Sequence, residues 1–236
     1  KMKNEFISSV SHELRTPLTS IRGWVETLRT LDDPTDENYR KGLEIINNET
    51  ARLYNMVEEL LDFSRLQNGR LKMECRPLDL VAELTDAVLF CEARIQREGL
   101  LLAYAEPEEM IPVYADPDRL RQVFINILDN AIKYSGDSPH IQITAEERNG
   151  SVIIRITDNG IGIEEEHLAH IFDKFYRVSN SKRPPVRGYG IGLFYVKTMI
   201  HMHNGTIRVE SQPGKGSCFI ITLPQTHERQ EIDIIG

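Results

Sequence analysis

A regular spacing of mostly apolar residues is the feature that most constrains the fold of this chain. From Leu43 to Ser64 the members of the series are 3, 4, 3, 4, 3 and 4 residues apart, which is the repeat of a coiled coil or helical bundle. The series consists of Leu43, Ile46, Thr50, Leu53, Val57, Leu60 and Ser64. A looser series lies upstream, at Phe6, Val10, Ile21, Trp24 and Leu28, and a polar stretch with Pro34 separates the two. The pattern predicts an antiparallel helical hairpin whose second helix starts at Thr35 or Asp36.

Two helices bury too little apolar surface to be stable alone. We therefore expect the hairpin to pair with a second copy of the chain and form a dimeric four-helix bundle. The alternative is a hairpin docked on the second domain of its own chain, and the length of the series favours the dimer. We place this dimerisation domain at residues 1–68, because Asn68 and Gly69 provide a helix end that can take a positive φ.

Beyond Gly69 the pattern changes to alternating strand-like and helix-like segments. Apolar or amphipathic segments occupy residues 79–96, 100–105 and 113–115, and two hairpin patterns pair 141–147 with 151–157 and 206–211 with 217–223. Asp116 and Pro117 are an N-cap and a first-turn proline for a helix that should run to about Tyr134. The fold class is therefore α + α/β. Residues 75–225 are predicted to form an α/β sandwich, a mixed sheet with helices on one face, and residues 226–236 are left unassigned.

Composition excludes several function classes. The 236 residues have a formal net charge of -8 and no Lys/Arg stripe interleaved with aromatic residues, so we expect no nucleic-acid partner. No apolar run approaches the ~20 residues that span a bilayer, and no signal peptide is visible. We expect a soluble, cytoplasmic chain that is part of a longer protein. Cys75, Cys91 and Cys218 are scattered, and we interpret them as reduced core thiols.

One histidine stands in a context suited to nucleophilic chemistry. The run SHELRTPL, residues 11–18, sets His12 beside Glu13 on a helical segment that Pro17 would bend. A neighbouring carboxylate stabilises the imidazolium that forms when the ring attacks an electrophile. Thr16 lies one helical turn after His12. The alternatives are a solvated helix histidine and an ordinary surface threonine. The other histidines are interpreted as solvated (His140, His167, His170, His227) or as complementing a helix carboxyl end (His201, His203).

The helix that begins after Asp116 carries a polar stripe beside its apolar one. Asn126 and Asn130 are four residues apart, and Lys133 and Tyr134 follow three and four residues later. At about 100° per residue they fall on one side of the helix. Asn carboxamides suit Mg²⁺ beside phosphates, Lys133 supplies a charge for those phosphates, and the Tyr134 ring can lie against a base. The alternative is an ordinary surface stripe.

A first glycine-rich segment, Asp158 to Gly162, follows a predicted strand. The Asp158 carboxylate can accept a hydrogen bond from an exocyclic amine, which favours adenine over guanine. Gly160 and Gly162 allow the backbone to approach a ligand. Taken alone, the segment is also compatible with a simple turn.

A second glycine-rich segment, Gly188 to Leu193, precedes an amphipathic helical segment. Free N–H groups at a helix start bind phosphate. The candidate nucleotide-binding residues here are Gly188, Gly190, Gly192 and Leu193. The preceding basic loop is interpreted as a lid that carries Arg177, Lys182, Arg183 and Arg187, and its alternative is a solvated charged loop. Phe172 and Phe175 at its root are expected in the core.

Together these segments resemble the sequence boxes of the sensor histidine kinases. Residues 11–18 are similar to the His box, 126–134 to the N box, 158–162 and 188–193 to the two glycine boxes, and 172–175 to the F box. Weak signals that agree in order and spacing support one another. Ser217 stands where relatives often have Thr, and Tyr189 lies inside the second glycine box; neither departure removes a chemical role.

The resemblance implies a fold and an activity. It implies a Bergerat-type ATP-binding domain in which Asn130 holds Mg²⁺, Asp158 reads the adenine amine and the lid closes over the triphosphate. It further implies that ATP phosphorylates Nε2 of His12 with Glu13 as the base, and that the phosphoryl group passes to an Asp of a response regulator. Thr16 would orient a water that dephosphorylates the regulator. We expect contact with a membrane only through a sensing part outside this chain.

Two other functions stay open at this point. The same nucleotide fold occurs in ATP-gated dimeric clamps such as Hsp90 and gyrase, and a dimeric scaffold with decayed ATP binding would have similar helices. The His box and the helical seam argue against the clamp. The intact Asn130, Asp158 and glycine segments argue against the scaffold.

Overall fold

The computed structural model describes residues 2–31, 37–136, 138–178 and 190–225, apart from the side chains of residues 2–6 and 9. The chain divides into two compact units, one made of residues 1–72 with 179–191 and one made of residues 73–178 with 192–236. The two units differ in class, because the first is built from helices and the second combines helices with a sheet.

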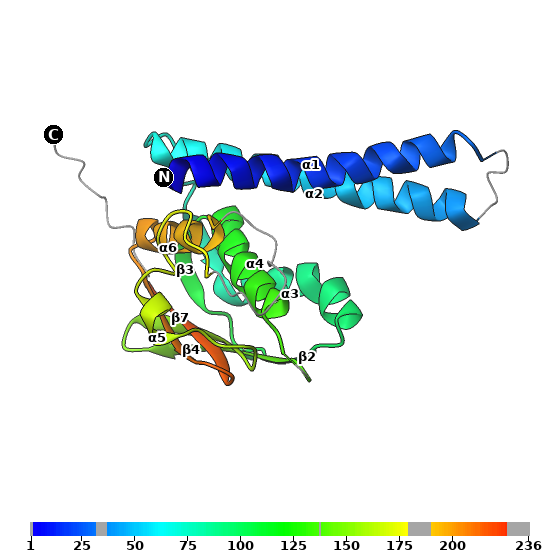
Figure 1. The fold of residues 1–236 in the computed structure, drawn as a ribbon. Coiled ribbons are helices and arrows are strands. Elements are labelled where there is room, and N and C mark those ends of the chain that lie inside the picture. The colour runs from blue at the N-terminus through cyan, green and yellow to red at the C-terminus, as the bar shows by residue number, and fades with distance from the viewer. Residues whose placement is uncertain (1, 32–36, 137, 179–189, 226–236) are drawn as a thin grey trace. The chain divides into compact units, whose positions relative to one another are not determined.

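The first unit is a pair of helices, α1 (Met2–Leu28) and α2 (Glu37–Gln67), which lie side by side in Figure 1. They approach closely at Gly42, where a Cβ would lie 2.8 Å from Cε3 of Trp24 and 2.9 Å from Cδ2 of Leu28. Pro17 lies inside α1. The predicted hairpin is confirmed, and the predicted helix start at Thr35 or Asp36 lies outside the described residues.

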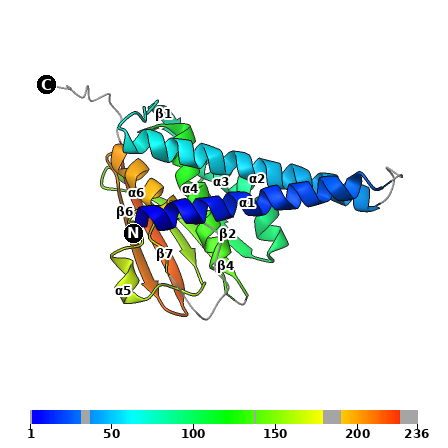
Figure 2. The same cartoon turned by 45° about the horizontal axis from the view of Figure 1, so that its top comes forward.

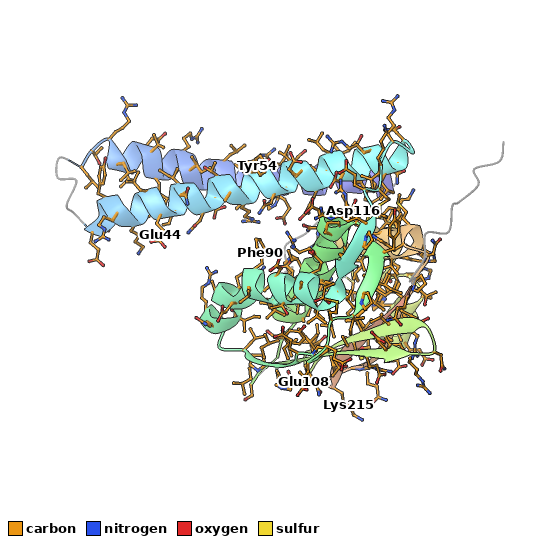
Figure 3. The ribbon with its side chains drawn as sticks, turned by 180° about the vertical axis from the view of Figure 1, so that it is seen from behind. Glu44, Tyr54, Phe90, Glu108, Asp116 and Lys215 are labelled. Atoms are coloured by element: carbon orange, nitrogen blue, oxygen red, sulfur yellow. The ribbon has the colours of Figure 1, made fainter. Side chains whose placement is uncertain are left out.

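Only part of the apolar surface of α2 is buried in the hairpin. Gly42 and Met56 are buried, whereas Leu43 and Val57 are 49% and 45% exposed. Other exposed apolar side chains are Tyr54 (labelled in Figure 3) and Leu61 on α2, and Ile7, Leu18 and Val25 on α1. A single hairpin therefore leaves much of its apolar surface in water.

The second unit is built on a five-stranded sheet with the strand order β2-β4-β5-β7-β6. The strands are β2 (Leu101–Ala105), β4 (His140–Arg148), β5 (Ser151–Asp158), β6 (Thr206–Gln212) and β7 (Gly216–Pro224). β2 pairs with β4 in parallel, and the other pairs are antiparallel, so the predicted mixed sheet is confirmed. β1 (Arg76–Asp79) and β3 (Pro112–Ala115) form a separate antiparallel pair.

The hairpin between β4 and β5 follows from its turn residues. Asn149 and Gly150 have φ values of 51° and 72°, as a tight two-residue turn between antiparallel strands requires. The pairing of Arg148 with Ser151 places these two residues at the tip. The sequence signal at Asn149-Gly150 therefore predicts this turn correctly.

Helices α3 (Leu80–Arg97), α4 (Pro117–Lys133) and α6 (Gly192–Met202) lie on one side of the sheet (Figures 1 and 2). Along β5 every second side chain from Val152 to Asp158 is buried, which is the pattern of a strand covered on one face. Phe124 of α4 is among the largest fully buried side chains. The short α5 (Glu165–Leu168) follows the first glycine segment.

A buried histidine joins the end of α6 to the start of α4. His203 Nε2 accepts the backbone N–H of Asp116 at 3.0 Å, and its Nδ1 donates to the Met199 carbonyl at 2.8 Å. Asp116 (Figure 3) in turn caps α4 by accepting the N–H of Arg119, and it also accepts the N–H of Glu74. Burial lowers the pKa of His203. The ring is therefore a neutral hydrogen-bonding group, and it complements the carboxyl end of α6 through the bond to Met199 and not through a charge.

The expectation that Phe172 and Phe175 belong to the core is wrong. Both are half-buried, while the neighbouring Ile171 is 7% exposed. The Lys197 Nζ lies 5.7 Å from the centroid of the Phe172 ring, so this half-buried ring has a cation over one face. Phe175 has a φ of 65°, which is a left-handed backbone conformation that non-glycine residues adopt rarely.

The three cysteines are free, but only Cys91 is a core thiol; Cys75 and Cys218 are half-buried. Burial raises the pKa of Cys91 to about 11, so its thiol is unreactive at neutral pH.

In the part of the chain that the structure describes, no helix has both the length and the apolar composition needed to cross a bilayer.

Candidate functional site

The polar stripe of α4 lies on the edge that the core leaves uncovered. The buried side of the helix includes Leu120, Val123, Phe124, Ile127, Leu128, Ala131 and Ile132. Asn126 and Asn130 are half-buried, whereas Lys133 and Tyr134 are exposed. Tyr134 ends the helix by donating its N–H to the Asn130 carbonyl at 2.9 Å. The four predicted residues therefore share one accessible edge.

An acidic residue, Asp129, belongs to this stripe and is not among the predicted site residues. It forms ion pairs with Lys133, one turn further on, and with Arg94 of α3. Burial alone would raise the pKa of Asp129, but the two cations outweigh burial and lower it. A phosphate would therefore share Lys133 with Asp129. The i,i+4 spacing of Asp129 and Lys133 is the signal by which this pair is visible in the sequence.

Asp158 lies at the end of β5 and is 9% exposed. Its Oδ1 accepts the backbone N–H of Gly160 at 2.8 Å and that of Ser217 at 3.3 Å. Burial raises the pKa of Asp158 in spite of these two hydrogen bonds. This carboxylate is held in one orientation and has little contact with water. A further hydrogen-bond donor would therefore stabilise its charged form strongly. Ser217 therefore contacts the site through its backbone N–H. In the sequence it stands out only because relatives often have Thr at this position.

Close backbone contacts require the glycines of this segment. A Cβ on Gly160 would lie 2.3 Å from the carbonyl oxygen of Tyr134, and a Cβ on Gly162 would lie 2.0 Å from that of Gln212. The Ile161 N–H donates to the same Tyr134 carbonyl at 3.1 Å. Gly160 therefore allows the segment to pack against the end of α4, and Gly162 allows it to pack against the end of β6. Their contact with a ligand stays a prediction.

The second glycine segment ends at the start of α6. Gly190 has a φ of 72°, and α6 begins at Gly192 with Leu193 in its first turn. Asn126 Oδ1 lies 4.0 Å from the position that a Gly192 Cβ would take. The start of α6 therefore lies beside the polar stripe of α4, as a site that binds phosphate between the two helices would need. Gly188 lies outside the described residues.

The root of the predicted lid is held by two histidines. Tyr176 shares a 2.8 Å hydrogen bond with Nδ1 of His167, and its ring centroid lies 5.5 Å from that of His170. The interpretation as a merely solvated histidine is therefore wrong for His167, whereas His170 is exposed as expected. Arg177 follows Tyr176 and is exposed. Three further lid residues, Lys182, Arg183 and Arg187, lie outside the described residues.

In the first unit, His12 and Thr16 are exposed on α1. They line a shallow depression together with Arg15, Thr19 and Ser20. The Thr16 hydroxyl donates to the His12 carbonyl at 3.2 Å, which is a common bond for a threonine within a helix. The imidazole is therefore accessible to a reagent from solution.

Glu13 turns toward the other helix of the hairpin. Its Oε2 accepts a hydrogen bond from Arg52 Nη2 of α2 at 3.2 Å, and its side chain is 12% exposed. Consecutive helix residues point about 100° apart, so Glu13 reaches α2 while His12 stays exposed. Arg52 is a further residue that the sequence reasoning missed, and the role of Glu13 toward His12 stays a prediction.

The donors of the second unit suit a nucleotide and a hard cation. No group of three or more His, Cys, Asp or Glu side chains that could hold a metal occurs among the described residues. The carboxamide oxygens of Asn126 and Asn130 suit a cation that is bound mainly by phosphate and water, as Mg²⁺ usually is. Asp158 offers an acceptor for an amine, and the start of α6 offers N–H groups for phosphate.

Two family models match the chain. The model described as "Histidine kinase-, DNA gyrase B-, and HSP90-like ATPase" matches residues 115–227, and the "His Kinase A (phospho-acceptor) domain" matches residues 2–69. The first match covers α4, both glycine segments and the sheet from β4 onward. The second match covers α1 and α2, with His12.

Individual relatives are similar over most of the chain. Sensor histidine kinase YclK of Bacillus subtilis is 36% identical over 233 residues, which are 98% of this chain and 48% of YclK. The structure of histidine kinase AdeS of Acinetobacter baumannii has a TM-score of 0.64 at 28% identity and covers 92% of this chain and 98% of AdeS. Histidine kinase ThkA, solved with response regulator protein TrrA, also has a TM-score of 0.64 at 28% identity, over 94% of this chain and 61% of the other. The chain spans about half the length of YclK.

The fold and site of the second unit define a class, the ATPases that resemble histidine kinases, gyrase B and HSP90. The match of residues 2–69 to the phosphoacceptor model separates the histidine kinases from the other members of that class. This chain belongs to the sensor histidine kinases of two-component systems, and it contains the two domains of their catalytic core. The clamp alternative is not favoured, because it leaves the domain at residues 2–69 unexplained.

Proposed function

We propose that this chain transfers the γ-phosphoryl group of ATP to His12. The observation that carries the proposal is the combination, in one chain, of two features. One is an exposed histidine in a phosphoacceptor helix, and the other is an ATPase domain whose Asp158 is buried and fixed by two N–H groups. The proposed domains are residues 1–68 for the phosphoacceptor and 75–225 for ATP binding.

The transfer forms a bond between Nε2 of His12 and the γ-phosphorus. It breaks the bond from that phosphorus to the bridging oxygen, which leaves with ADP. The imidazole starts neutral with its proton on Nδ1, and Glu13 accepts this proton as the ring gains positive charge. Asn130 would hold Mg²⁺, which would supply positive charge beside the phosphates, and Asn126 is assigned to binding the nucleotide.

The nucleotide is selected at Asp158. Its carboxylate accepts a hydrogen bond from the exocyclic amine of adenine. Guanine has a carbonyl oxygen at that position, which has no hydrogen to donate. Tyr134 packs on the base. Lys133 and Arg177, with the N–H groups at Gly190, Gly192 and Leu193, bind the phosphates, and Gly160 and Gly162 keep the base-binding loop close to the ligand. Gly188 is assigned to the same phosphate loop.

We further propose a response regulator as the partner. The similarity to ThkA, a histidine kinase solved in complex with the response regulator protein TrrA, supports this step. The phosphoryl group moves from His12 to an aspartate of the regulator. Thr16, one turn from His12 and exposed, orients a water that hydrolyses the aspartyl phosphate of the regulator and releases inorganic phosphate.

A homodimer is the proposed form of the first unit. The apolar side chains left exposed on α1 and α2, including Leu43 and Val57, support a four-helix bundle with a second copy. Burying such residues against an equivalent hairpin removes apolar surface from water.

The decisive experiment incubates the chain with γ-labelled ATP and Mg²⁺. We expect a phosphoryl group that is stable to alkali and labile to acid, as a phosphorus–nitrogen bond is. An ATP-gated clamp would release phosphate without becoming labelled, and a scaffold would do neither. Either of these two results would contradict the proposal.

Two variants assign the residues. His12→Gln should abolish labelling while nucleotide binding persists, and label that survives this change would show the acceptor to be another residue. Asn130→Asp should lower labelling about 100-fold, the usual scale for a lost electrostatic contact at a transferred group. Binding of a fluorescent ATP analogue provides the control that each variant is folded.

A further inference from the structure

The Glu13 carboxylate belongs to a cluster that reaches across the hairpin. Arg52 Nη2 donates to Glu13 Oε2 at 3.2 Å, and Arg52 Nη1 lies 3.5 Å from Glu49 Oε2. The side chains of Arg52, Glu13 and Glu49 are 28%, 12% and 25% exposed, so solvent screens these charges less than it screens surface pairs. One cation therefore serves two carboxylates, one from each helix.

Glu49 is poorly satisfied in this arrangement. Its Oε2 is buried and accepts no hydrogen bond from the described residues, although Arg52 lies at ion-pair distance. A buried acceptor without a hydrogen bond is unfavourable. A small movement of Arg52 toward Glu49 would satisfy this oxygen and would loosen the hold of Arg52 on Glu13.

The position of Glu13 matters because this carboxylate is the proposed acceptor of the His12 proton. His12 is exposed, whereas Glu13 points into the hairpin. Glu13 must therefore leave Arg52, at least in part, to serve the imidazole. Arg52 still has an ion-pair partner when Glu13 moves away, because Glu49 can accept its hydrogen bond. Without that second carboxylate, the release of Glu13 would leave an unpaired and largely buried cation, which is costly.

We infer that Arg52 is a positioning residue that withholds Glu13 from His12, and that Glu49 releases Glu13 by competing for Arg52. The inference rests on the proposed function, since it concerns the proton acceptor of the same transfer. The cluster sets the rate at which His12 is phosphorylated. It does not set the affinity for ATP, because the proposed ATP site lies in the other unit.

The test measures initial rates of His12 labelling from γ-labelled ATP, with the whole chain and over a range of ATP concentrations. Arg52→Gln removes the charge that holds Glu13, so we expect kcat to rise about fivefold, the size of one partly exposed ion pair, with KM for ATP unchanged. Glu49→Gln removes the competitor, so we expect kcat to fall by a similar factor. The double variant should behave like Arg52→Gln alone, because Glu49 acts only through Arg52.

Two control variants separate this role from a structural one. Arg65 lies on the same helix and pairs with Asp62 at 3.4 Å, so Arg65→Gln removes an arginine and an ion pair within α2 without touching Glu13 and should label like the parent chain. Arg52→Lys keeps the charge but offers one nitrogen where Arg52 offers two, so its kcat should lie between those of the parent and Arg52→Gln. Helical circular dichroism monitors folding in every variant.

Opposite signs for Arg52→Gln and Glu49→Gln support the inference. It is overturned if both variants label more slowly than the parent at normal ATP binding, or if neither changes kcat. Should Arg52→Gln fail to fold, Glu49→Gln decides alone, and an unchanged or faster rate overturns the inference. A parent chain that takes up no label contradicts the proposed function instead, so the two failures are distinguishable.

Discussion

Gly162 and Gly214 adopt nearly the same backbone conformation in very different surroundings. Their φ values are 68° and 74°. A Cβ on Gly162 would lie 2.0 Å from the Gln212 carbonyl oxygen, whereas a Cβ on Gly214 would have no atom within 4 Å. Alanine at each position therefore separates the conformational cost of a positive φ from the steric cost of a filled contact.

We predict that Gly162→Ala lowers the free energy of unfolding by about 3 kcal/mol or more, because overpacking adds to the strain of a left-handed residue. Gly214→Ala should cost about 1 kcal/mol, from the backbone alone. Urea unfolding followed by circular dichroism measures both. Equal losses would mean that the loop at Gly162 can move away from Gln212, and that its close packing does not depend on glycine.

Asp158 shows how one site residue works against stability. Burial raises its pKa, so the folded state holds the proton more tightly than the unfolded state does. The stability gained from this residue is present below its unfolded pKa and is lost as the pH rises through the folded pKa. At neutral pH the carboxylate is thus kept at a cost in stability, as residues with a chemical role often are.

At the scale of elements, the junction between α6 and α4 depends on one neutral histidine. His203 accepts from the Asp116 N–H and donates to the Met199 carbonyl. Protonation of Nε2 would turn this acceptor into a donor that faces another donor. Burial opposes the charge and lowers the pKa of His203, while the nearby Asp116 carboxylate favours the charge to a smaller extent.

This junction predicts a dependence of stability on pH. For a histidine with a lowered pKa, stability is complete above the unfolded pKa of about 6.5 and is lost as the pH falls through the folded value. The parent chain should therefore need less urea to unfold at pH 5 than at pH 7.5. His203→Gln should have a free energy of unfolding about 1 to 2 kcal/mol below that of the parent chain at pH 7.5. Its free energy of unfolding should also fall less than that of the parent when the pH is lowered.

His201 provides the control for this measurement, since it lies in the last turn of α6, two residues before His203, and is exposed. His201→Gln should keep the full pH dependence of the parent chain. If His203→Gln loses stability on acidification as steeply as the parent, another group controls the acid transition.

At the scale of the whole molecule, the first unit is incomplete as a single hairpin. Leu43, Tyr54, Val57 and Leu61 are exposed along α2, and an exposed apolar stripe of this kind is typical of an association surface. The second unit has its own buried core around α4 and the sheet. Dimerisation should therefore stabilise the hairpin much more than it stabilises the ATP-binding unit.

We predict that Val57→Glu weakens the dimer at least tenfold, because the bundle would bury a charge in place of an apolar side chain. Asn55→Glu adds the same charge at an exposed position on the opposite side of α2 and should leave the dimer intact. Size-exclusion chromatography with light scattering, over a dilution series, gives the mass of each species. A parent chain that runs as a monomer at all concentrations would contradict the four-helix bundle.

Local signals in the sequence predict most of the architecture. The seam from Leu43 to Ser64 predicts a helix, Asp116-Pro117 predicts the start of α4, and Asn149-Gly150 predicts the turn between β4 and β5. Each signal depends on the periodicity or the allowed dihedral angles of neighbouring residues. It can therefore be recognised from a few residues without the rest of the molecule. The expectation of buried Phe172 and Phe175 fails because composition does not reveal which side of a short irregular segment meets the core.

The sequence by itself determined most of the elements, their order and the residue types of the candidate site, although it did not show β1 and its pairing with β3. Only the tertiary structure decided which side chains pair. Arg52 meets Glu13 across 39 residues, Arg94 meets Asp129 across 35, and His203 meets Asp116 across 87. Helix periodicity and turn chemistry act over a few residues, whereas the partner of a charged or buried polar group depends on how distant elements pack, and that packing places Glu13 on Arg52.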